Sequence, residues 1–403
     1  MATSTDTTIK PVTIPVGHTP ALTAPRRLES LDVFRGLTIA GMILVNDPGA
    51  ASYWPLDHAD ELMTAHATGW YPGKWWIDAN GWTPTDLIFP FFLFIVGTSM
   101  ILSFAARRAR GDSRLALMKH AVRRSVLILL IGYAIRILPY VDFSHMRYPG
   151  VLQRIALVYL CASAITLWSS SRGRIVWIAG LLVGYYALSR FVSVPGCDHP
   201  AWMTQHCSLA GWLDRKLMLG HLYRRDFDPE GLLSTFPAIA TTLLGTLAGE
   251  FLRGTTSLSH KLRGLGLAGL AGVVAGYVWH PWFPISKPLW TSSYVLFTAG
   301  AACLLLTVCW WLIEIRGWHA WAKPLLWLGS NAILIYTLST FAAKLGAIIK
   351  VAGGITLQGW IYEHWFAPLV QEKNASLAFA LSYTVLWTLV AWGLHKKKIF
   401  VKV

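Results

Sequence analysis

Long runs of apolar residues, separated by shorter polar stretches, dominate this chain. Ten runs are long enough to cross a bilayer core about 30 Å thick. They cover roughly residues 31–48, 86–106, 119–138, 150–169, 174–193, 232–252, 262–280, 291–312, 324–349 and 376–394. The ninth run is long enough to be broken or strongly tilted. The pattern predicts an all-α fold, a polytopic integral membrane helix bundle of about ten transmembrane helices.

The charged residues between these runs alternate in sign and predict the topology. Acidic residues gather in the odd-numbered gaps, at Asp57, Asp60, Glu61, Asp78, Asp142, Asp198, Asp214, Asp226, Asp228 and Glu230. Basic residues gather in the even-numbered gaps and near the C-terminus, at Arg107, Arg108, Arg110, Arg114, Lys119, Arg123, Arg124, Arg172, Arg174, Arg253, Lys261, Arg263, Arg316, Lys323, Lys396, Lys397 and Lys398. Because cytoplasmic segments are rich in lysine and arginine, both termini are expected inside.

Composition supports the membrane interpretation. Of the 403 residues, 54% are hydrophobic and only 14% are charged, against about 25% in an ordinary soluble domain. These values exclude a disordered chain, a secreted disulfide scaffold and a soluble two-domain enzyme. The net charge of +15 lies mostly on the predicted cytoplasmic face. The lipid bilayer, and not nucleic acid, is therefore the expected partner.

The chain divides into three parts. Residues 1–26 are rich in Thr and Pro, lack the features of a signal peptide and are expected to form a disordered cytoplasmic tail. Residues 27–395 form the membrane domain, and residues 396–403 a basic cytoplasmic tail. Function is expected in the long outward loops, which are 49–85, 194–231 and 350–375.

Cysteine spacing predicts a disulfide and no metal site. Cys197 and Cys207 share the second outward loop, ten residues apart. An oxidising compartment would favour a bridge between them, and two free thiols are the alternative. No metal-binding pattern such as CxxC or HExxH occurs in the sequence, so no metal is expected.

Charged residues inside the apolar runs are costly and indicate either pairing or function. Asp32 and Arg35 are three residues apart, so an ion pair on one helix face is one interpretation. Asn46 ends the first run, and Asp86 opens the second. Either Thr85 or Thr83 could cap the second helix, with Asp86 in its first turn, and this capping interpretation and a functional role for Asp86 are equally favoured.

Further polar residues lie near the outward ends of the runs, with the pair Ser330 and Asn331 as the exception. The outward group comprises Gln153, Arg154, Glu230, Trp290, Ser292, Ser293 and Tyr294. Together these side chains predict a polar cavity that opens outward. From the residues alone, an enzyme of acyl or proton transfer and a proton-coupled carrier are equally favoured.

Several strings of this sequence resemble the heparan-α-glucosaminide N-acetyltransferase family. They are residues 27–36, 45–46, 58–59, 83–91, 149–155, 228–231, 289–294 and 330–332. Their order is highly specific, and the likeness extends from about residue 27 to 395. The chain looks like a prokaryotic-type member without the luminal domain that precedes the bundle in the lysosomal enzyme.

The resemblance implies a transmembrane N- or O-acetyltransferase. Acetyl-CoA would serve from the cytoplasmic side, and an amine or hydroxyl acceptor, an amino sugar or glycan, would react on the other. By motif, His58 is the catalytic histidine, either as carrier of the acetyl group or as a base, with Asn46 and Asp86 completing the centre. A homodimer in a bacterial inner membrane, with the His58 loop facing the periplasm, is expected.

The other polar residues of the matching strings are expected to bind acetyl-CoA or the acceptor. They are Asp32, Arg35, Gln153, Arg154, Glu230, Trp290, Ser292, Ser293, Tyr294, Ser330 and Asn331. The basic stretch from Arg107 to Arg124 could attract the CoA phosphates, although the positive-inside rule alone accounts for it.

The chain departs from the family pattern after His58. Residues 61–79 are inserted there and bring a second candidate, His66. The string 55–59 matches the family upstream of the insertion and favours His58. The alternative functions are a carrier or flippase for a sugar-linked or anionic solute, and a non-catalytic relative that only binds CoA or lipid.

Overall fold

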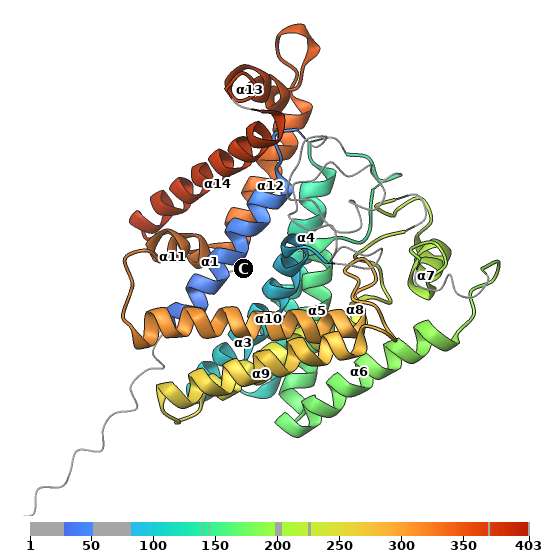
Figure 1. Ribbon diagram of the computed structural model, residues 1–403, viewed down its shortest axis with the longest axis vertical. Coiled ribbons are helices and arrows are strands. Elements are labelled where there is room, and N and C mark those ends of the chain that lie inside the picture. Colours follow the sequence, from blue (N-terminus) through green and yellow to red (C-terminus); the bar gives the residue numbers. More distant parts are fainter. Residues whose placement is uncertain are drawn as a thin grey trace, which may run out of the picture.

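The computed structural model describes residues 28–50, 82–139, 141–144, 146–197, 204–224, 227–369 and 371–401. Most of these residues lie in helices, and among them the only β pairing is an isolated bridge between Lys350 and Thr356 (Figure 1). The elements are α1 (Glu29–Asn46), η3 (Pro84–Leu87), α3 (Ile88–Ala109), α4 (Arg114–Ile137), α5 (Val151–Trp168), α6 (Ser171–Phe191), α7 (Leu209–Met218), α8 (Thr235–Arg253), α9 (Leu258–Trp279), α10 (Ser292–Trp310), η5 (Trp311–Ile315), α11 (Lys323–Ser330), α12 (Ala332–Ile348), η6 (Ala352–Gly354), α13 (Leu357–Trp365) and α14 (Glu372–Lys396).

Each of the ten apolar runs coincides with a helix or, for the ninth, a helix pair. Within the described residues, six helices are long and apolar enough to cross a membrane, or up to seven if the bent pair α11–α12 is one span. Helices α1, α4 and α6 each carry at least three charged residues, which lowers their mean hydropathy. The all-helical membrane bundle is thus confirmed, whereas the count of ten and the topology stay predictions.

The ninth run is broken, as its length suggested. Helices α11 and α12 meet at Asn331 with a bend of 84°. Asn331 has a φ of −126° and a ψ of 37°, outside the helical region, so it interrupts the backbone hydrogen-bond ladder. We call the end of the bundle that holds Asn46 the outer end, and the end that holds Asp32 the inner end, after the predicted topology.

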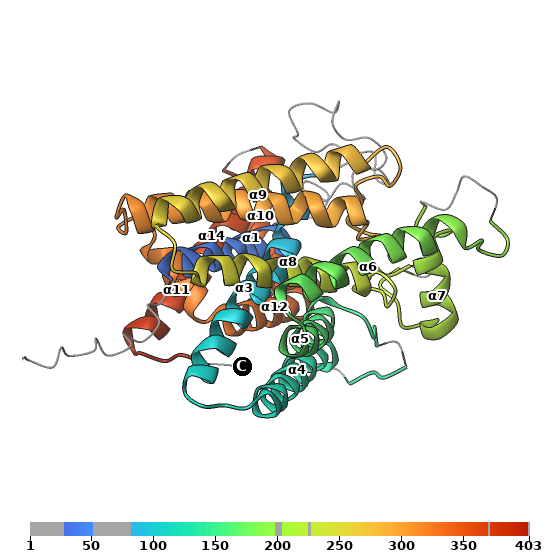
Figure 2. The same cartoon turned by 90° about the horizontal axis from the view of Figure 1, so that it is seen from below.

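Helices α3 and α8 pack with their backbones in direct contact. A Cβ atom added at Gly97 would lie 1.9 Å from the carbonyl oxygen of Thr242, and one at Gly245 would lie 2.0 Å from that of Phe94. Only glycine permits such an approach, which is common between membrane helices. Helices α9 and α10 also run side by side, as both ribbon views show (Figure 2).

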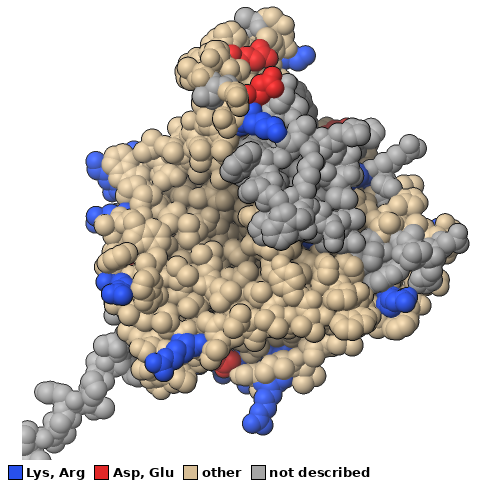
Figure 3. All heavy atoms as spheres, viewed as in Figure 1, with Lys and Arg blue, Asp and Glu red and all other residues tan. Residues whose placement is uncertain are grey.

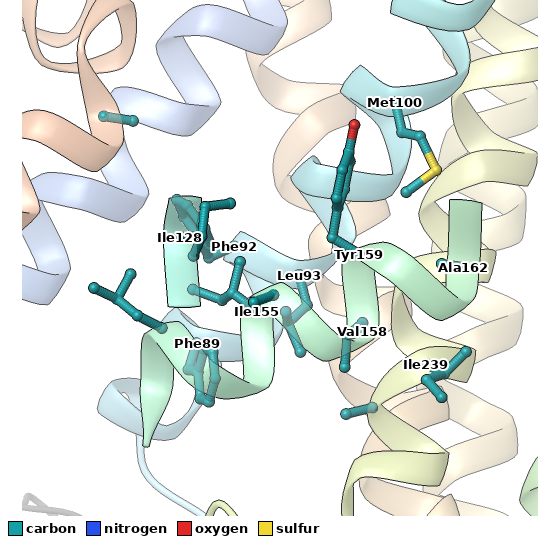
Figure 4. Close-up of a cluster of buried hydrophobic side chains, with 14 of the residues drawn as sticks. Phe89, Phe92, Leu93, Met100, Ile128, Ile155, Val158, Tyr159, Ala162 and Ile239 are labelled. Carbon is teal, nitrogen blue, oxygen red and sulfur yellow. The ribbon is translucent and has the colours of Figure 1, made fainter. Parts of the chain in front are cut away.

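The apolar core lies where α3, α4, α5 and α8 meet (Figure 4). Phe92 and Leu93 from α3 pack with Ile155 and Val158 from α5, and Ile239 reaches the same cluster from α8. Leu93 and Val158 are fully buried. This core fixes the relative positions of four helices, of which α5 carries the predicted site residues Gln153 and Arg154.

The surface shows a broad uncharged area. In the view of Figure 3, lysine, arginine and acidic side chains lie at the margins of the described surface, and its middle is uncharged. Large apolar side chains are exposed on the outer helices, as at Val176 on α6, Leu267 on α9 and Val385 on α14. Such a surface is compatible with lipid contact. Two short helices, α7 and α13, occupy parts of the predicted outward loops.

Candidate functional site

Arg147, just before α5, is the centre of an ion-pair network at the outer end. Its Nε and Nη2 atoms donate to the two carboxylate oxygens of Asp228 at 2.6 and 2.5 Å, and Nη2 also donates to Glu230. Burial lowers the pKa of Arg147, but its bonds to Asp228 and Glu230 outweigh this effect and the pKa is raised. The predicted site residue Glu230 therefore lies in a compensated charge network.

The turn after α7 is built around buried carboxylates. Asp228 accepts hydrogen bonds from the backbone N–H groups of Glu230 and Tyr223 at 2.9 and 2.8 Å. Asp214, on α7, accepts one from the N–H of Leu232 at 3.0 Å. Burial raises the pKa of Asp214 to about 7, because its charged form loses solvation.

Arg154 is a fully buried cation next to this turn. Its Nη2 donates to the carbonyl oxygen of Gly231 at 3.0 Å and to Ser234 Oγ at 2.5 Å. The guanidinium carbon lies 5.0 Å from the centre of the Trp290 ring. Among the described residues, its Nε and Nη1 atoms have no hydrogen-bond partner. The network thus keeps donors of Arg154 available in the interior.

Trp290 and Tyr294 connect the start of α10 to the start of α3. Trp290 has a φ of 50°, a strained backbone conformation for a bulky residue. Its Nε1 donates to Thr241 Oγ1 at 3.3 Å, and its ring meets that of Tyr294 edge to face at 5.4 Å. The Tyr294 hydroxyl donates to the carbonyl oxygen of Asp86. Tyr294 therefore holds the backbone of Asp86, and Trp290 packs against the Tyr294 ring.

The carboxylate of Asp86 forms the capping box that the sequence suggested. Its Oδ2 accepts from the backbone N–H of Thr83 at 2.9 Å and from Thr83 Oγ1 at 3.1 Å. Lys287 Nζ lies 3.5 Å from the other oxygen, Oδ1. The capping interpretation is thus present in the structure, and the catalytic role of Asp86 stays a prediction.

Ser292 and Ser293 are buried and bonded to backbone carbonyl groups. The Ser292 hydroxyl donates to Leu182 in α6 at 2.7 Å, and the Ser293 hydroxyl donates to Phe283. Both residues have no solvent exposure. Their hydroxyl groups therefore join α10 to its neighbours and do not face a cavity.

A cavity of about 460 Å³ opens at the outer end between α4, α5 and α12. Arg136, Arg147, Gln153 and Lys344 line it. Gln153 is 4% exposed, and its Nε2 has no hydrogen-bond partner among the described residues. Lys344 donates to three carbonyl groups at the end of α4. The predicted outward polar cavity thus has a structural counterpart at Gln153.

The three residues predicted for the catalytic centre are not all described. Asn46 is the last residue of α1, at the outer end, and is exposed. Asp86 lies in the short helix η3, which precedes α3. His58 and the alternative His66 fall within residues 51–81, outside the described part of the chain.

A second polar cavity, of about 550 Å³, lies at the inner end between α1, α3, α4, α5 and α12. Arg35 lines it and donates to Asp32 Oδ1 at 2.9 Å, to Ser99 Oγ at 2.6 Å and to the carbonyl oxygen of Gly329 at 3.3 Å. Arg124 contributes a second guanidinium to the lining. The ion pair that the spacing of Asp32 and Arg35 suggested is therefore present.

Asn331 holds the C-terminal segment against this inner cavity. Its Nδ2 donates to the carbonyl oxygen of Ile399 at 3.0 Å, and its Oδ1 accepts from the N–H of Val401 at 2.9 Å. Phe400 and Val401 line the cavity, as does Ser330. The sequence strings did not indicate this contribution of the C-terminal segment.

The second outward loop contains the disulfide that its spacing suggested. Cys197 and Cys207 are joined, with their Cα atoms 5.7 Å apart. No group of three or more His, Cys, Asp or Glu side chains that could hold a metal ion occurs in the described part of the chain.

The structure separates the predicted binding residues into two groups. The outer group comprises Asp86, Gln153, Arg154, Glu230, Trp290, Ser292, Ser293 and Tyr294, and the inner group Asp32, Arg35, Ser330 and Asn331. Along α1, the fourteen-residue step from Asp32 to Asn46 corresponds to about 21 Å. Sequence reasoning missed Ser99 and Asp47, and only the position of Asp47 beside Asn46 could have indicated it.

Comparison with known proteins relates the sequence of this chain to one enzyme family. The catalytic family of heparan-alpha-glucosaminide N-acetyltransferase matches residues 27–276. The chain is 29% identical to the heparan-alpha-glucosaminide N-acetyltransferase of Mus musculus over 434 residues, and 28% identical to that of Homo sapiens over 436 residues. Each alignment covers 94% of this chain and 60% of the relative, so the chain spans about 60% of the length of these curated relatives. This integral membrane protein belongs to the heparan-alpha-glucosaminide N-acetyltransferase catalytic family.

Proposed function

We propose that this protein is a membrane acetyltransferase that moves an acetyl group from cytoplasmic acetyl-CoA to an acceptor on the outward side. The acceptor carries an amine or hydroxyl group, on an amino sugar or glycan. The observation that carries this proposal is the family match over residues 27–276. The two polar cavities, one at each end of the bundle, are consistent with a donor and an acceptor that arrive from opposite sides.

The inner cavity is the proposed entrance for acetyl-CoA. Arg35 and Arg124 line it, and their positive charges attract phosphate groups. Ala332 and Ile333, the first residues of α12, also line it, so the positive end of that helix dipole lies at the cavity. These features suit the anionic part of CoA, and the extended pantetheine arm would carry the thioester towards the outer end.

His58 is the proposed acyl-transfer residue. As carrier, its neutral imidazole attacks the thioester carbonyl, the C–S bond breaks, and CoA leaves as a thiol after taking up a proton. The acceptor then attacks the acetyl-imidazole, the acyl C–N bond breaks, and the leaving nitrogen takes up the proton that the acceptor loses, which restores the neutral imidazole. In direct transfer, His58 instead removes the proton from the attacking acceptor.

Asn46 and Asp86 are the proposed partners of His58. The Asn46 amide would donate to the developing oxyanion, and Asp86 would orient the imidazole or accept its proton. The eight-residue step from Ala50 to His58 can span at most about 28 Å. The chain is therefore long enough for His58 to return to Asn46, which lies four residues before Ala50.

The test is acetyl transfer by purified protein in detergent with radiolabelled acetyl-CoA and an amino-sugar acceptor. We expect His58→Ala to lower the rate at least a hundredfold, and Asn46→Ala at least tenfold. His66→Ala is the matched control, because it removes a second histidine of the same loop. Equal CoA release by His58→Ala and the unmodified protein would overturn the assignment of His58.

The same experiment separates the proposed function from a carrier. Absence of CoA binding and turnover with every amine or sugar acceptor would favour a carrier or flippase. Detection of acetylated His58 by mass spectrometry, after incubation with acetyl-CoA and no acceptor, would support an acetyl-histidine intermediate over direct transfer.

Labelling of single cysteines introduced into residues 51–81 would test the periplasmic position of the His58 loop in a bacterial inner membrane. Crosslinking in the same membranes would test the homodimer.

A further inference from the structure

A third cavity, of about 370 Å³, lies at the outer end between α12, α13 and α14. Its walls are largely apolar and include the aromatic side chains of Trp365, Phe366, Phe379 and Tyr383. Asp47, the residue after Asn46, is the only charged side chain among the described residues that line it. A single carboxylate in an aromatic pocket indicates a polar ligand group of opposite charge.

Asp47 has no partner of its own within the described residues. It is 7% exposed, and its carboxylate forms no ion pair or hydrogen bond with any described residue. The cation on the adjacent face of α12, Lys344, instead donates to the carbonyl groups of Ile135, Arg136 and Leu138. Because an unpaired carboxylate at membrane depth is costly, Asp47 calls for a cationic partner, and none of the described residues supplies one.

The backbone around Asp47 is fixed by α13 and α14. Gln358 Nε2 donates to the carbonyl oxygen of Pro48 at 2.8 Å, and the Ser376 hydroxyl bonds both the N–H and the carbonyl oxygen of Ala50, at 3.1 and 3.0 Å. A Cβ atom at Gly49 would lie 2.6 Å from the Tyr362 ring, so this position requires glycine. The backbone that carries the Asp47 side chain is therefore held in place before any ligand arrives.

We propose that this cavity is the acceptor subsite, in which Asp47 binds the ammonium group of the acceptor and selects amines over alcohols. The inference rests on the proposed acetyl transfer and specifies its acceptor. Asp47 follows Asn46, the residue proposed for the catalytic centre, so the cavity lies at the same end of the bundle as Asn46.

The walls of the cavity fit a ring that carries the amine. Flat apolar faces, such as those of a sugar or an aryl group, pack against aromatic side chains like Trp365 and Tyr383. An ammonium group pairs with a buried carboxylate, whereas a hydroxyl group in the same place leaves the charge uncompensated. The site is therefore expected to favour an amino-sugar glycoside over the glycoside with a hydroxyl at the same carbon.

Binding of two matched probes tests this proposal without catalysis. Phenyl 2-amino-2-deoxyglucoside and phenyl glucoside differ only in the group that would face Asp47. Calorimetric titration of the His58→Ala protein should show at least tenfold tighter binding of the amine. Asp47→Asn in the same background should reduce this ratio to about twofold or less. In the otherwise unmodified protein, Asp47→Asn should lower kcat/KM for the amine at least tenfold and leave the KM for acetyl-CoA unchanged.

A matched control and a second variant complete the test. Glu363→Gln removes the same charge from an exposed position of α13 and should leave the binding ratio unchanged. Tyr383→Leu changes an aromatic wall and should weaken binding of both probes while keeping their ratio, which tests the cavity even if Asp47→Asn unfolds. An unchanged ratio in folded Asp47→Asn overturns the inference. Asp47-dependent amine binding without any acetyl transfer supports the subsite and overturns the proposed function instead.

Discussion

At the outer end of the bundle, carboxylates near α5 and α8 have partners in the protein, whereas Asp47 near α14 has none among the described residues. Arg147 compensates Asp228 and Glu230, and the backbone N–H groups of Tyr223 and Glu230 also donate to the Asp228 carboxylate. Asp47 is comparably buried but faces only an aromatic cavity. The difference indicates that Asp228 and Glu230 stabilise the fold, although they belong to a family motif. Asp47, which belongs to no motif, is the better candidate for ligand binding.

The largest expected effect follows from removing the compensating cation. Arg147→Met leaves Asp228 and Glu230 buried without their partner and should reduce the free energy of unfolding by about 3–5 kcal/mol. Denaturant unfolding in detergent measures this change, with the exposed Lys350→Met as the control. A decrease in the free energy of unfolding of less than about 1 kcal/mol would show that Asp228 and Glu230 do not depend on Arg147 for compensation.

The second effect concerns Asp214, whose pKa is about 7 because of burial. The native state keeps this proton up to about pH 7, whereas the unfolded chain releases it near pH 4. The native state therefore binds more protons between these values, so its stability falls as pH rises from about 4 to 7. Asp214→Asn should remove a fall of the order of 2 kcal/mol across this window.

Unfolding curves of the Asp214→Asn and unmodified proteins at pH 4.5, 6 and 7.5 provide the measurement. The variant keeps an oxygen to accept from Leu232, so the comparison isolates the titrating proton. Parallel pH dependence in the two proteins would contradict the buried, protonated carboxyl group.

A smaller effect is expected from the capping box. Asp86→Ala removes the acceptor of two bonds from Thr83 and should cost about 1 kcal/mol of stability. Thr83→Ala should cost a similar amount, and the double variant less than the sum, because both changes break one interaction. Additive losses would indicate that the two residues act separately. Loss of acetyl transfer beyond this destabilisation, measured in folded protein, would reveal a catalytic role for Asp86.

The smallest effect, and one of opposite sign, is expected for Asp47. Asp47→Asn removes a buried charge without breaking a bond to any described residue, so it should raise thermal stability slightly, by less than about 1 kcal/mol. Thermal unfolding without acceptor measures this change, with Glu363→Gln as the control. A clear destabilisation would mean that the carboxylate is compensated within the protein after all.

The sequence predicted the helices well because membrane crossing imposes a long apolar run on each of them. Local spacing also predicted the Thr83–Asp86 cap, the Asp32–Arg35 pair and the bridge between Cys197 and Cys207. These features depend on residues at most ten positions apart.

Contacts between distant segments were not predictable in this way. Arg147 and Asp228 are 81 residues apart, and Asn331 meets the C-terminal segment 68 and 70 residues later. No periodic pattern links such positions, so their pairing appears only in the folded bundle. The sequence also could not predict that Asp47 lacks a cationic partner among the described residues, because this depends on the direction of the Lys344 side chain.

The close contact of α3 with α8 has a mechanical consequence. Gly97 and Gly245 place backbone against backbone, and no rotamer change at these two positions can relieve a displacement there. Sliding or separation of these two helices would have to move both main chains together. In any motion that passes a substrate from one end of the bundle to the other, α3 and α8 should therefore move as one rigid body. Bending should occur at other positions, such as Asn331.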